Sequence, residues 1–325
     1  MSFRRKTVLL FALLVLTAAG ALFCGAAGGW EMLRELVNGN LSAGNASVLF
    51  EIRLPRITGA AAAGVLLAAA GCTVQLLFRN PLSSPHVLGS VNASALGAVG
   101  VMACGVTAPG WLLCGSSAGA LAALGLLLAL PRRNGRIAVL LLAGIALNAF
   151  ASAAMSGLLF MAGERLEGLV FWLLGGFWKL DWHSTGLLLA VTAVILPVLL
   201  TVRREMNMLY LGEDAARHAG VDTRKIIAVA VITSSLATAA VVASCGVIGF
   251  VGLLVPHIAR AVFGGDFARH LAGSALIGAV LMIGADCAAR TLMNPMEVPV
   301  GVLTSLIGAP FFLFLILRKL KQSEI

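Results

Sequence analysis

Long apolar stretches separated by short polar clusters dominate the pattern of hydrophobic and polar positions along the chain. The stretches without Asp, Glu, Lys or Arg are residues 7–30, 57–78, 80–131, 137–163, 182–202, 226–259 and 298–317. Each is long enough for at least one helix to cross ~30 Å of hydrocarbon, which takes about 20 residues. The pattern therefore predicts an all-α, polytopic membrane protein.

Two of these stretches are too long for a single helix. Residues 80–131 must cross twice, and Pro109-Gly110 marks the turn between the crossings. Residues 226–259 contain glycines that predict a break between two helices, namely Gly246, Gly249 and Gly252. A further span covers about residues 270–290, which brings the expected total to about ten transmembrane helices.

The basic residues predict how these helices are oriented. The first stretch follows Arg4-Arg5-Lys6 and looks like a secretory signal, but it is too long for a signal core, and we interpret it as the first span. With the N-terminus inside, most of the 23 Lys and Arg residues are cytoplasmic, as the positive-inside rule expects. The N- and C-termini are then both cytoplasmic. The basic residues left outside are Arg34, Arg53, Arg56, Arg165, Lys179 and Arg290.

Composition excludes several classes of protein. The chain is 60% apolar and only 11% charged, against roughly 25% charged residues in soluble domains. It is therefore not a soluble enzyme, a disordered chain or a disulfide scaffold, and residues 1–325 form a single membrane domain. The net charge of +9 is a topological signal, so we expect no nucleic-acid partner. The six cysteines have no CxxC spacing and are interpreted as buried apolar residues.

Motifs for catalysis are missing from the sequence. It contains no GxxxxGK[ST] phosphate loop, no HExxH, and no acidic cluster that would hold Mg²⁺ with a diphosphate. We expect no catalytic residue, no metal site and no cofactor bound by this chain. The chain is therefore not predicted to be an enzyme, and any energy it uses comes from a partner.

One acidic residue lies deep in an expected span. Asp286 is one helical turn before Arg290, where the two side chains can pair. A structural ion pair is one interpretation. The other is a proton relay, which would make the protein an ion-gradient-driven secondary carrier or channel, since such carriers need ionisable groups inside the membrane. A purely structural scaffold is a third alternative.

The longest polar segment is the loop of residues 203–225. Glu213 and Asp214 suit the first turn of a helix and Gly220 suits its left-handed cap, so a helix of about two turns is predicted. It presents a small face made by Ala215, Ala216 and Ala219. Exposed apolar residues are expected before it, namely Met206, Met208, Leu209 and Leu211. So short a helix must dock, either on the protein's own bundle or in a groove of a cytoplasmic partner.

Other segments carry polar or helix-breaking residues. Arg53 and Arg56 are expected to be exposed outside, where they meet either carboxylates of an extracytoplasmic protein or lipid headgroups. Residues 78–89 and 246–260 are interrupted by Gly and Pro, and such breaks often flank a transport path. A polar stripe in the fifth span lines a pathway or packs helices together, and consists of Asn148, Ser152 and Ser156.

The same segments resemble the FecCD/vitamin B12-type permease family of ABC importers. The matching motifs run in order along nearly the whole chain. They are Arg53-Leu-Pro-Arg56, Phe78-Arg-Asn-Pro-Leu82 with Pro85 and Leu88-Gly89, Leu211-Gly-Glu-Asp-Ala-Ala-Arg217 with Gly220-Val221, Ile248-Gly-Phe-Val-Gly-Leu253 with Pro256-His257 and Arg260, Asp286 with Arg290, and Pro299-Val-Gly-Val302 with Gly308-Ala-Pro-Phe-Phe312.

The resemblance implies a permease that imports an iron-siderophore, haem or cobalamin across the cytoplasmic (inner) membrane. It implies as partners two cytoplasmic ABC ATPase subunits that use ATP and Mg²⁺, an extracytoplasmic substrate-binding protein, and a second permease copy. It places the gate region at Ile137 and Ala138 and binding-protein docking at Arg53, Arg56 and Arg290. The coupling residues it implies are Leu211, Gly212, Glu213, Asp214, Ala215, Ala216, Arg217, Ala219 and Gly220.

Overall fold

The computed structural model describes residues 3–25, 29–130, 136–293 and 296–323, and every regular element in these ranges is helical. The elements in chain order are α1 (Phe3–Phe23), α2 (Gly29–Val37), α3 (Ala43–Ser47), η1 (Val48–Arg53), α4 (Leu54–Leu77), η2 (Pro85–Leu88), α5 (Ser90–Ala103), α6 (Pro109–Ala129), α7 (Arg136–Phe160), η3 (Gly163–Arg165), α8 (Leu166–Leu173), α9 (Trp182–Thr201), α10 (Arg203–Leu211), α11 (Glu213–His218), α12 (Thr223–Cys245), α13 (Val251–Phe263), α14 (Phe267–Thr291) and α15 (Val300–Ser323).

Seven helices in the described ranges are long and apolar enough to cross a membrane. They lie within α1, α3–α4, α6, α7, α9, α12 and α14. Three shorter apolar helices accompany them, namely α5, α13 and the Val300–Phe314 part of α15. Both predicted interruptions are confirmed, since α5 ends before Pro109 and α12 ends at Cys245, just before Gly246, whose φ is +70°.

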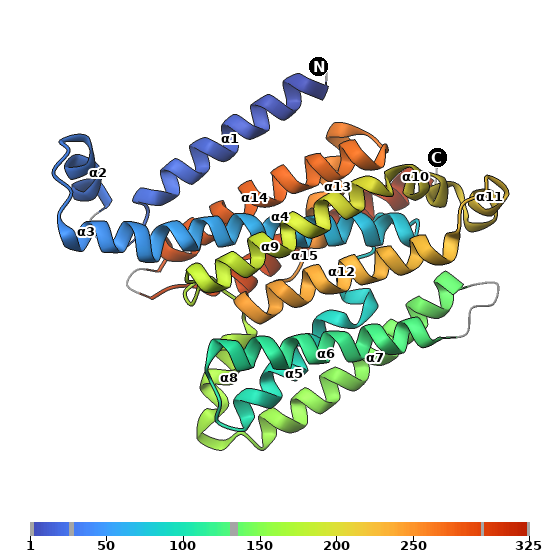
Figure 1. The fold of residues 1–325 in the computed structure, drawn as a ribbon, viewed down its shortest axis with the longest axis horizontal. Helices are drawn as coiled ribbons and strands as arrows, with labels where there is room; N and C mark the ends of the chain where they lie inside the picture. The colour runs from blue at the N-terminus through green and yellow to red at the C-terminus, as the bar shows by residue number, and fades with distance from the viewer. Residues whose placement is uncertain (1–2, 26–28, 131–135, 294–295, 324–325) are drawn as a thin grey trace.

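Helix α4 is the centre of the bundle and packs against α9, α12, α13 and α14 (Figure 1). Its spanning part is 89% buried. Glycines allow the backbones to come together: a Cβ on Gly64 would lie 2.2 Å from the carbonyl oxygen of Gly278, and one on Gly71 would lie 1.8 Å from that of Gly252. Such close approach favours van der Waals packing between helices in a bilayer.

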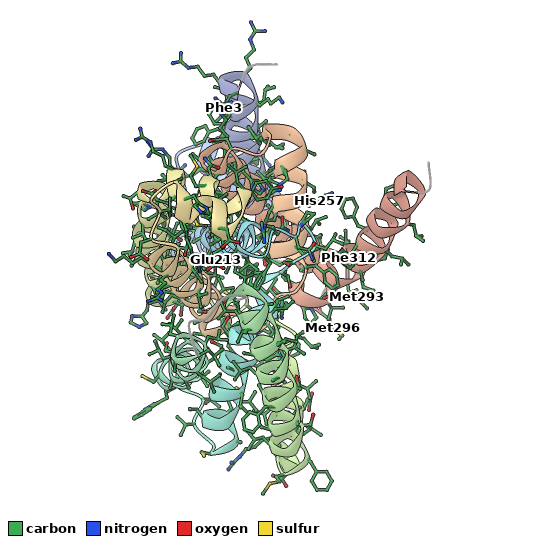
Figure 2. The ribbon with its side chains drawn as sticks, turned by 90° about the vertical axis from the view of Figure 1, so that its right-hand side faces the viewer. Phe3, Glu213, His257, Met293, Met296 and Phe312 are labelled. Carbon is green, nitrogen blue, oxygen red and sulfur yellow. The ribbon has the colours of Figure 1, made fainter. Side chains whose placement is uncertain are left out.

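Helices α5–α8 form a second group, which meets the first along α12 (Figure 1). Within it α5 and α6 pack closely, because a Cβ on Gly97 would lie 2.0 Å from the carbonyl oxygen of Gly115. Helix α1 lies to one side against α14, and its spanning part is only 6% buried. Figure 2 shows that α15, which carries Phe312, projects away from the bundle. The exposed apolar faces of α1 and α15 are therefore open to lipid or to another chain.

Candidate functional site at the two ends of the bundle

Helix α11 is the short helix that the polar loop predicts. Gly220 has a φ of +81° and closes the helix. Its N–H donates to the carbonyl of Arg217 (2.9 Å), and the N–H of Val221 donates to that of Ala216 (3.0 Å). These two bonds define a Schellman motif, which satisfies the last carbonyls of the helix. The left-handed cap at Gly220 is therefore confirmed.

The charged side chains of α11 differ in their exposure to solvent. Arg217 pairs with Glu213, lies 3.8 Å from Asp214, and donates to the hydroxyl of Thr223 at 3.2 Å. The side chain of Glu213 is only 14% exposed, whereas that of Asp214 is 89% exposed. Glu213 therefore stabilises the helix from within, and Asp214 is the acidic group that faces outward.

The small face predicted for α11 is divided between two environments. Ala216 is fully buried against the protein's own bundle, while Ala215 and Ala219 are exposed. The helix thus rests on the protein's own bundle through Ala216 and leaves Ala215 and Ala219 accessible. Asp222 then caps α12 by accepting the N–H of Lys225 at 3.2 Å, and this backbone hydrogen bond is the main reason that the pKa of Asp222 is lowered.

A cleft of about 700 Å³ joins α11 to the start of α7. The predicted gate residues Ile137 and Ala138 line it together with Gly212 and Ala215. Arg79 closes its other side, from the turn that ends α4. The predicted gate residues and the predicted coupling residues are far apart in the sequence. They nevertheless line the same cleft.

Arg79 adopts a backbone conformation that the sequence pattern does not predict. Its φ is +49°, in the left-handed region that glycine usually fills. Its N–H donates to Leu76 and that of Asn80 donates to Gln75, both at 3.0 Å, which is again a Schellman closure. A Cβ on Gly212 would lie 3.5 Å from the Arg79 guanidinium. The strained turn thus presents this cation beside the start of α11.

Helix α10 corrects part of the sequence interpretation. Met206 and Leu209, which were expected to be exposed, are fully buried, whereas Met208 and Leu211 are exposed as predicted. The reason is that α10 is amphipathic and lies on α4 and α14. Its buried face anchors the segment that carries α11.

Polar contacts fasten α10 to the connection between α13 and α14. Asn207 accepts the N–H of Phe267 at 2.8 Å and donates to Asp266 at 3.1 Å. Arg260 donates to the hydroxyl of Tyr210 at 2.9 Å and lies 5.0 Å from its ring centroid. These contacts tie α10 to α13 and to the start of α14.

The N-terminal end of α13 borders a cavity of about 870 Å³. The two interrupted segments both contribute to it, through Ser84 and His86 and through Val247 and Phe250. Phe250 has a φ of +65° and packs against Gly308 of α15, where a Cβ would lie 2.4 Å from the Cβ of Phe250. The helix breaks therefore line a cavity at bundle depth, as such breaks must.

The polar stripe of α7 makes contacts between helices. Asn148 donates to the carbonyl of His86, and Ser152 accepts from Asn92 at 3.2 Å. Ser156 donates to the carbonyl of Ser152 at 3.0 Å. None of these side chains is among the residues that line the two large cavities, so the observed contacts favour helix packing.

The predicted docking arginines lie at the opposite end of the bundle and are buried. Arg53 is 4%, Arg56 6% and Arg290 6% exposed, so the expectation that Arg53 and Arg56 are exposed is wrong. Arg56 binds Asp286 (Nε–Oδ1 2.9 Å) and forms two bonds to Glu297 (3.0 and 2.8 Å). We call Arg53, Arg56, Asp286, Arg290 and Glu297 the arginine cluster.

The rest of the cluster explains why the arginines are inside. Arg290 pairs with Asp286 (Nε–Oδ2 3.1 Å), which confirms the predicted ion pair. Arg290 also donates to the carbonyl of Cys24 at 2.9 Å, and Arg53 donates to that of Leu22. The arginines thus satisfy backbone carbonyls where α1 ends, a position where cations are favourable. The sequence pointed to Asp286 and Arg290 but not to Glu297, which carries no local pattern.

In the described residues, an all-helical bundle with seven apolar helices of spanning length, interrupted helices beside a cavity of about 870 Å³ and a short capped helix at one end define a multi-pass membrane protein of the transporter class. The family model described as the FecCD transport family matches residues 8–318. The chain belongs to this family, and its resemblance to ABC importer permeases is confirmed.

Individual relatives agree over most of the chain. The hemin transport system permease protein HmuU of Yersinia pestis is 38% identical over 323 residues, covering 96% of this chain and 95% of the relative. The cobalamin import system permease protein BtuC of Halobacterium salinarum is 40% identical, covering 82% and 72%. A solved inward-facing structure of a metal-chelate type ABC transporter superposes with a TM-score of 0.88 at 30% identity, covering 97% and 99%.

Proposed function

We propose that the chain is the membrane-spanning subunit that moves an iron chelate, haem or cobalamin through the cytoplasmic membrane, energised by separate ATPase subunits. The observation that carries the coupling part of this proposal is the cleft shared by Ile137, Ala138, Gly212 and Ala215. An ATPase that grips α11 there acts on the gate directly, because the two walls of the cleft belong to α11 and α7.

The transport path of this proposal uses the cavity bordered by α13 and α15. The seven long helices together with α5, α13 and α15 supply the ten spans, with both chain ends in the cytoplasm. The exposed apolar face of α15, with Leu306 and Leu313 more than half exposed, is available to a second permease copy. Two ATPases at the α11 end and one binding protein at the arginine-cluster end complete the assembly.

The large chelates named for the relatives fit a wide, mostly apolar cavity. Only a few polar groups border it, among them Ser84 and Ser305. Such a lining holds a large rigid ligand weakly, which suits passage, because a site of this kind makes few fixed hydrogen bonds. In this proposal, the binding protein selects which chelate is transported.

Docking of the binding protein requires the arginine cluster to open. Glu297 is the displaceable partner, because its side chain is 36% exposed whereas that of Asp286 is 1% exposed. An acidic side chain on the binding protein can take its place on Arg56. Arg53 and Arg290 then contribute positive potential at the same surface.

Reconstitution tests the proposal. The chain is placed in vesicles with its ATPase and its binding protein, and chelate uptake and ATP hydrolysis are measured together. We expect uptake to require ATP and hydrolysis to be stimulated by the loaded binding protein. Uptake by the chain alone, driven by an ion gradient and abolished by Asp286→Asn, would instead establish the secondary-carrier alternative.

Filling the cleft tests the coupling step. Ala215→Leu places a larger side chain where the ATPase must fit, and we expect uptake to fall about tenfold, the factor that ~1.4 kcal/mol of lost binding produces. Ala261→Leu is the matched control, since Ala261 is exposed at the same end and does not line the cleft. Equal uptake by both variants would show that α11 is not the contact.

A further inference from the structure

A lateral apolar groove runs between α6 and α9, apart from the two functional ends. Its floor is α12, which both helices contact and which lies between them in Figure 1. The groove encloses about 460 Å³ and is lined by apolar side chains such as Leu121, Val194 and Ala240. Leu121 is 53% and Val194 64% exposed, so the groove is open to the side. In a spanning segment that side is the hydrocarbon of the bilayer.

The groove leads to a polar end. A second, smaller cavity of about 50 Å³ shares Leu113 and Leu187 with it, so the two lie next to each other. This cavity is lined by Lys179, His183 and Ser184. An ammonium, an imidazole and a hydroxyl are all hydrogen-bond donors, and an ammonium favours an anionic acceptor such as a phosphate.

The length of the groove identifies what it holds. Its lining runs from Leu113 to Leu121 on α6 and from Leu187 to Ile195 on α9, which at 1.5 Å per residue is about 12 Å in each case. Half of a ~30 Å hydrocarbon core is about 15 Å. The groove therefore extends through one leaflet, whereas a docked transmembrane helix would need a surface that spans both.

We propose that this groove binds a phospholipid, with one acyl chain between α6 and α9 and the phosphate at Lys179, His183 and Ser184. Water cannot fill an apolar groove at this depth, and an acyl chain gains dispersion contacts along the whole wall. The lipid belongs to the leaflet opposite α11, because α9 begins beside Lys179 and ends at α10. Bound there, the lipid fills the space between α6 of the α5–α8 group and helices α9 and α12.

Photolabelling tests the proposal independently of transport. The full-length chain is placed in phosphatidylcholine vesicles that contain phosphatidylglycerol with a diazirine in its acyl chain, and labelled residues are mapped by mass spectrometry after illumination. We expect labels concentrated on the groove walls. Ala190→Phe fills the groove and should lower this labelling about tenfold, the factor that excluding two methylene groups produces. Ala193→Phe, on the same helix but outside the groove, should leave it unchanged.

Lys179→Glu tests the phosphate end with a variant that leaves the groove intact. It should reduce labelling by phosphatidylglycerol severalfold. Labels spread evenly over all lipid-facing helices, with Ala190→Phe and Lys179→Glu both without effect, would overturn the proposal. An Ala190→Cys variant provides a second check. A disulfide between two chains at this position, with no lipid label in the groove, would also overturn the proposal, because the occupant would then be a second copy.

Discussion

The two ends of the bundle use charge in opposite ways. At the arginine cluster, the three arginines and Asp286 are buried between α4, α14 and the end of α1, and several bonds join elements distant in sequence, as Arg56 does with Asp286. At the α10–α11 end, the ion pairs are local, as in Glu213–Arg217, and Asp214 is exposed. Charges at the first end hold the fold together, while those at the second remain available to a partner.

The difference follows from the cost of leaving each charge unpaired. A buried ion loses its hydration, so removal of one partner leaves the other uncompensated. An exposed pair is screened and contributes little. Substitutions at the two ends should therefore separate stability from function, and the variants below test that separation.

The largest expected effect is at Asp286. Asp286→Ala leaves Arg56 and Arg290 buried without their shared carboxylate, and we expect a loss of about 3–5 kcal/mol in the free energy of unfolding. Thermal unfolding of the purified chain in detergent measures it. Asp214→Ala at the other end should change stability by no more than about 0.5 kcal/mol. Equal effects would mean that the two ends do not differ in this way.

The next effect concerns the polar fastening of α10. Asn207→Asp puts a carboxylate beside Asp266, and we expect the amides of residues 203–218 to exchange hydrogen about fivefold faster, equivalent to ~1 kcal/mol. The double variant Asn207→Asp with Asp266→Asn restores one donor and one acceptor in swapped positions. Hydrogen exchange should then return toward the original rate. Failure of the swap to rescue would show that shape rather than this bond fixes α10.

A smaller effect is expected at Glu297. This residue is the partly exposed member of the arginine cluster and so resembles the exposed charges of the α10–α11 end. Glu297→Gln weakens the partner that holds Arg56, so affinity for the binding protein should rise about threefold, as loss of a partly exposed pair allows. Titration with labelled binding protein measures it. Glu51→Gln is the control at the same end, since Glu51 contacts Ser47 and not the cluster. A weaker affinity of Glu297→Gln would mean that Glu297 itself contacts the partner.

Much of the fold could be predicted because its signals are local. Apolar run lengths predicted the spans, glycines predicted the breaks at Gly246 and Pro109-Gly110, and Gly220 predicted the end of α11. The burial of the arginines could not be predicted, because it depends on α1 and Glu297 approaching from distant parts of the chain. Likewise, the left-handed Arg79 breaks the local preference for glycine, so no residue pattern marks it.

The smallest effect tests whether α11 depends on its cap. Gly220 has a φ of +81° with open space around it, so Gly220→Ala adds only backbone strain, about 1 kcal/mol. We expect faster hydrogen exchange in α11 and an unchanged unfolding temperature, whereas Gly186→Ala, in the regular part of α9, should not loosen α11. If exchange in α11 is instead unchanged, burial of Ala216 and not the cap holds the helix in place. The α10–α11 end would then be held by packing, whereas the arginine cluster is held by charge.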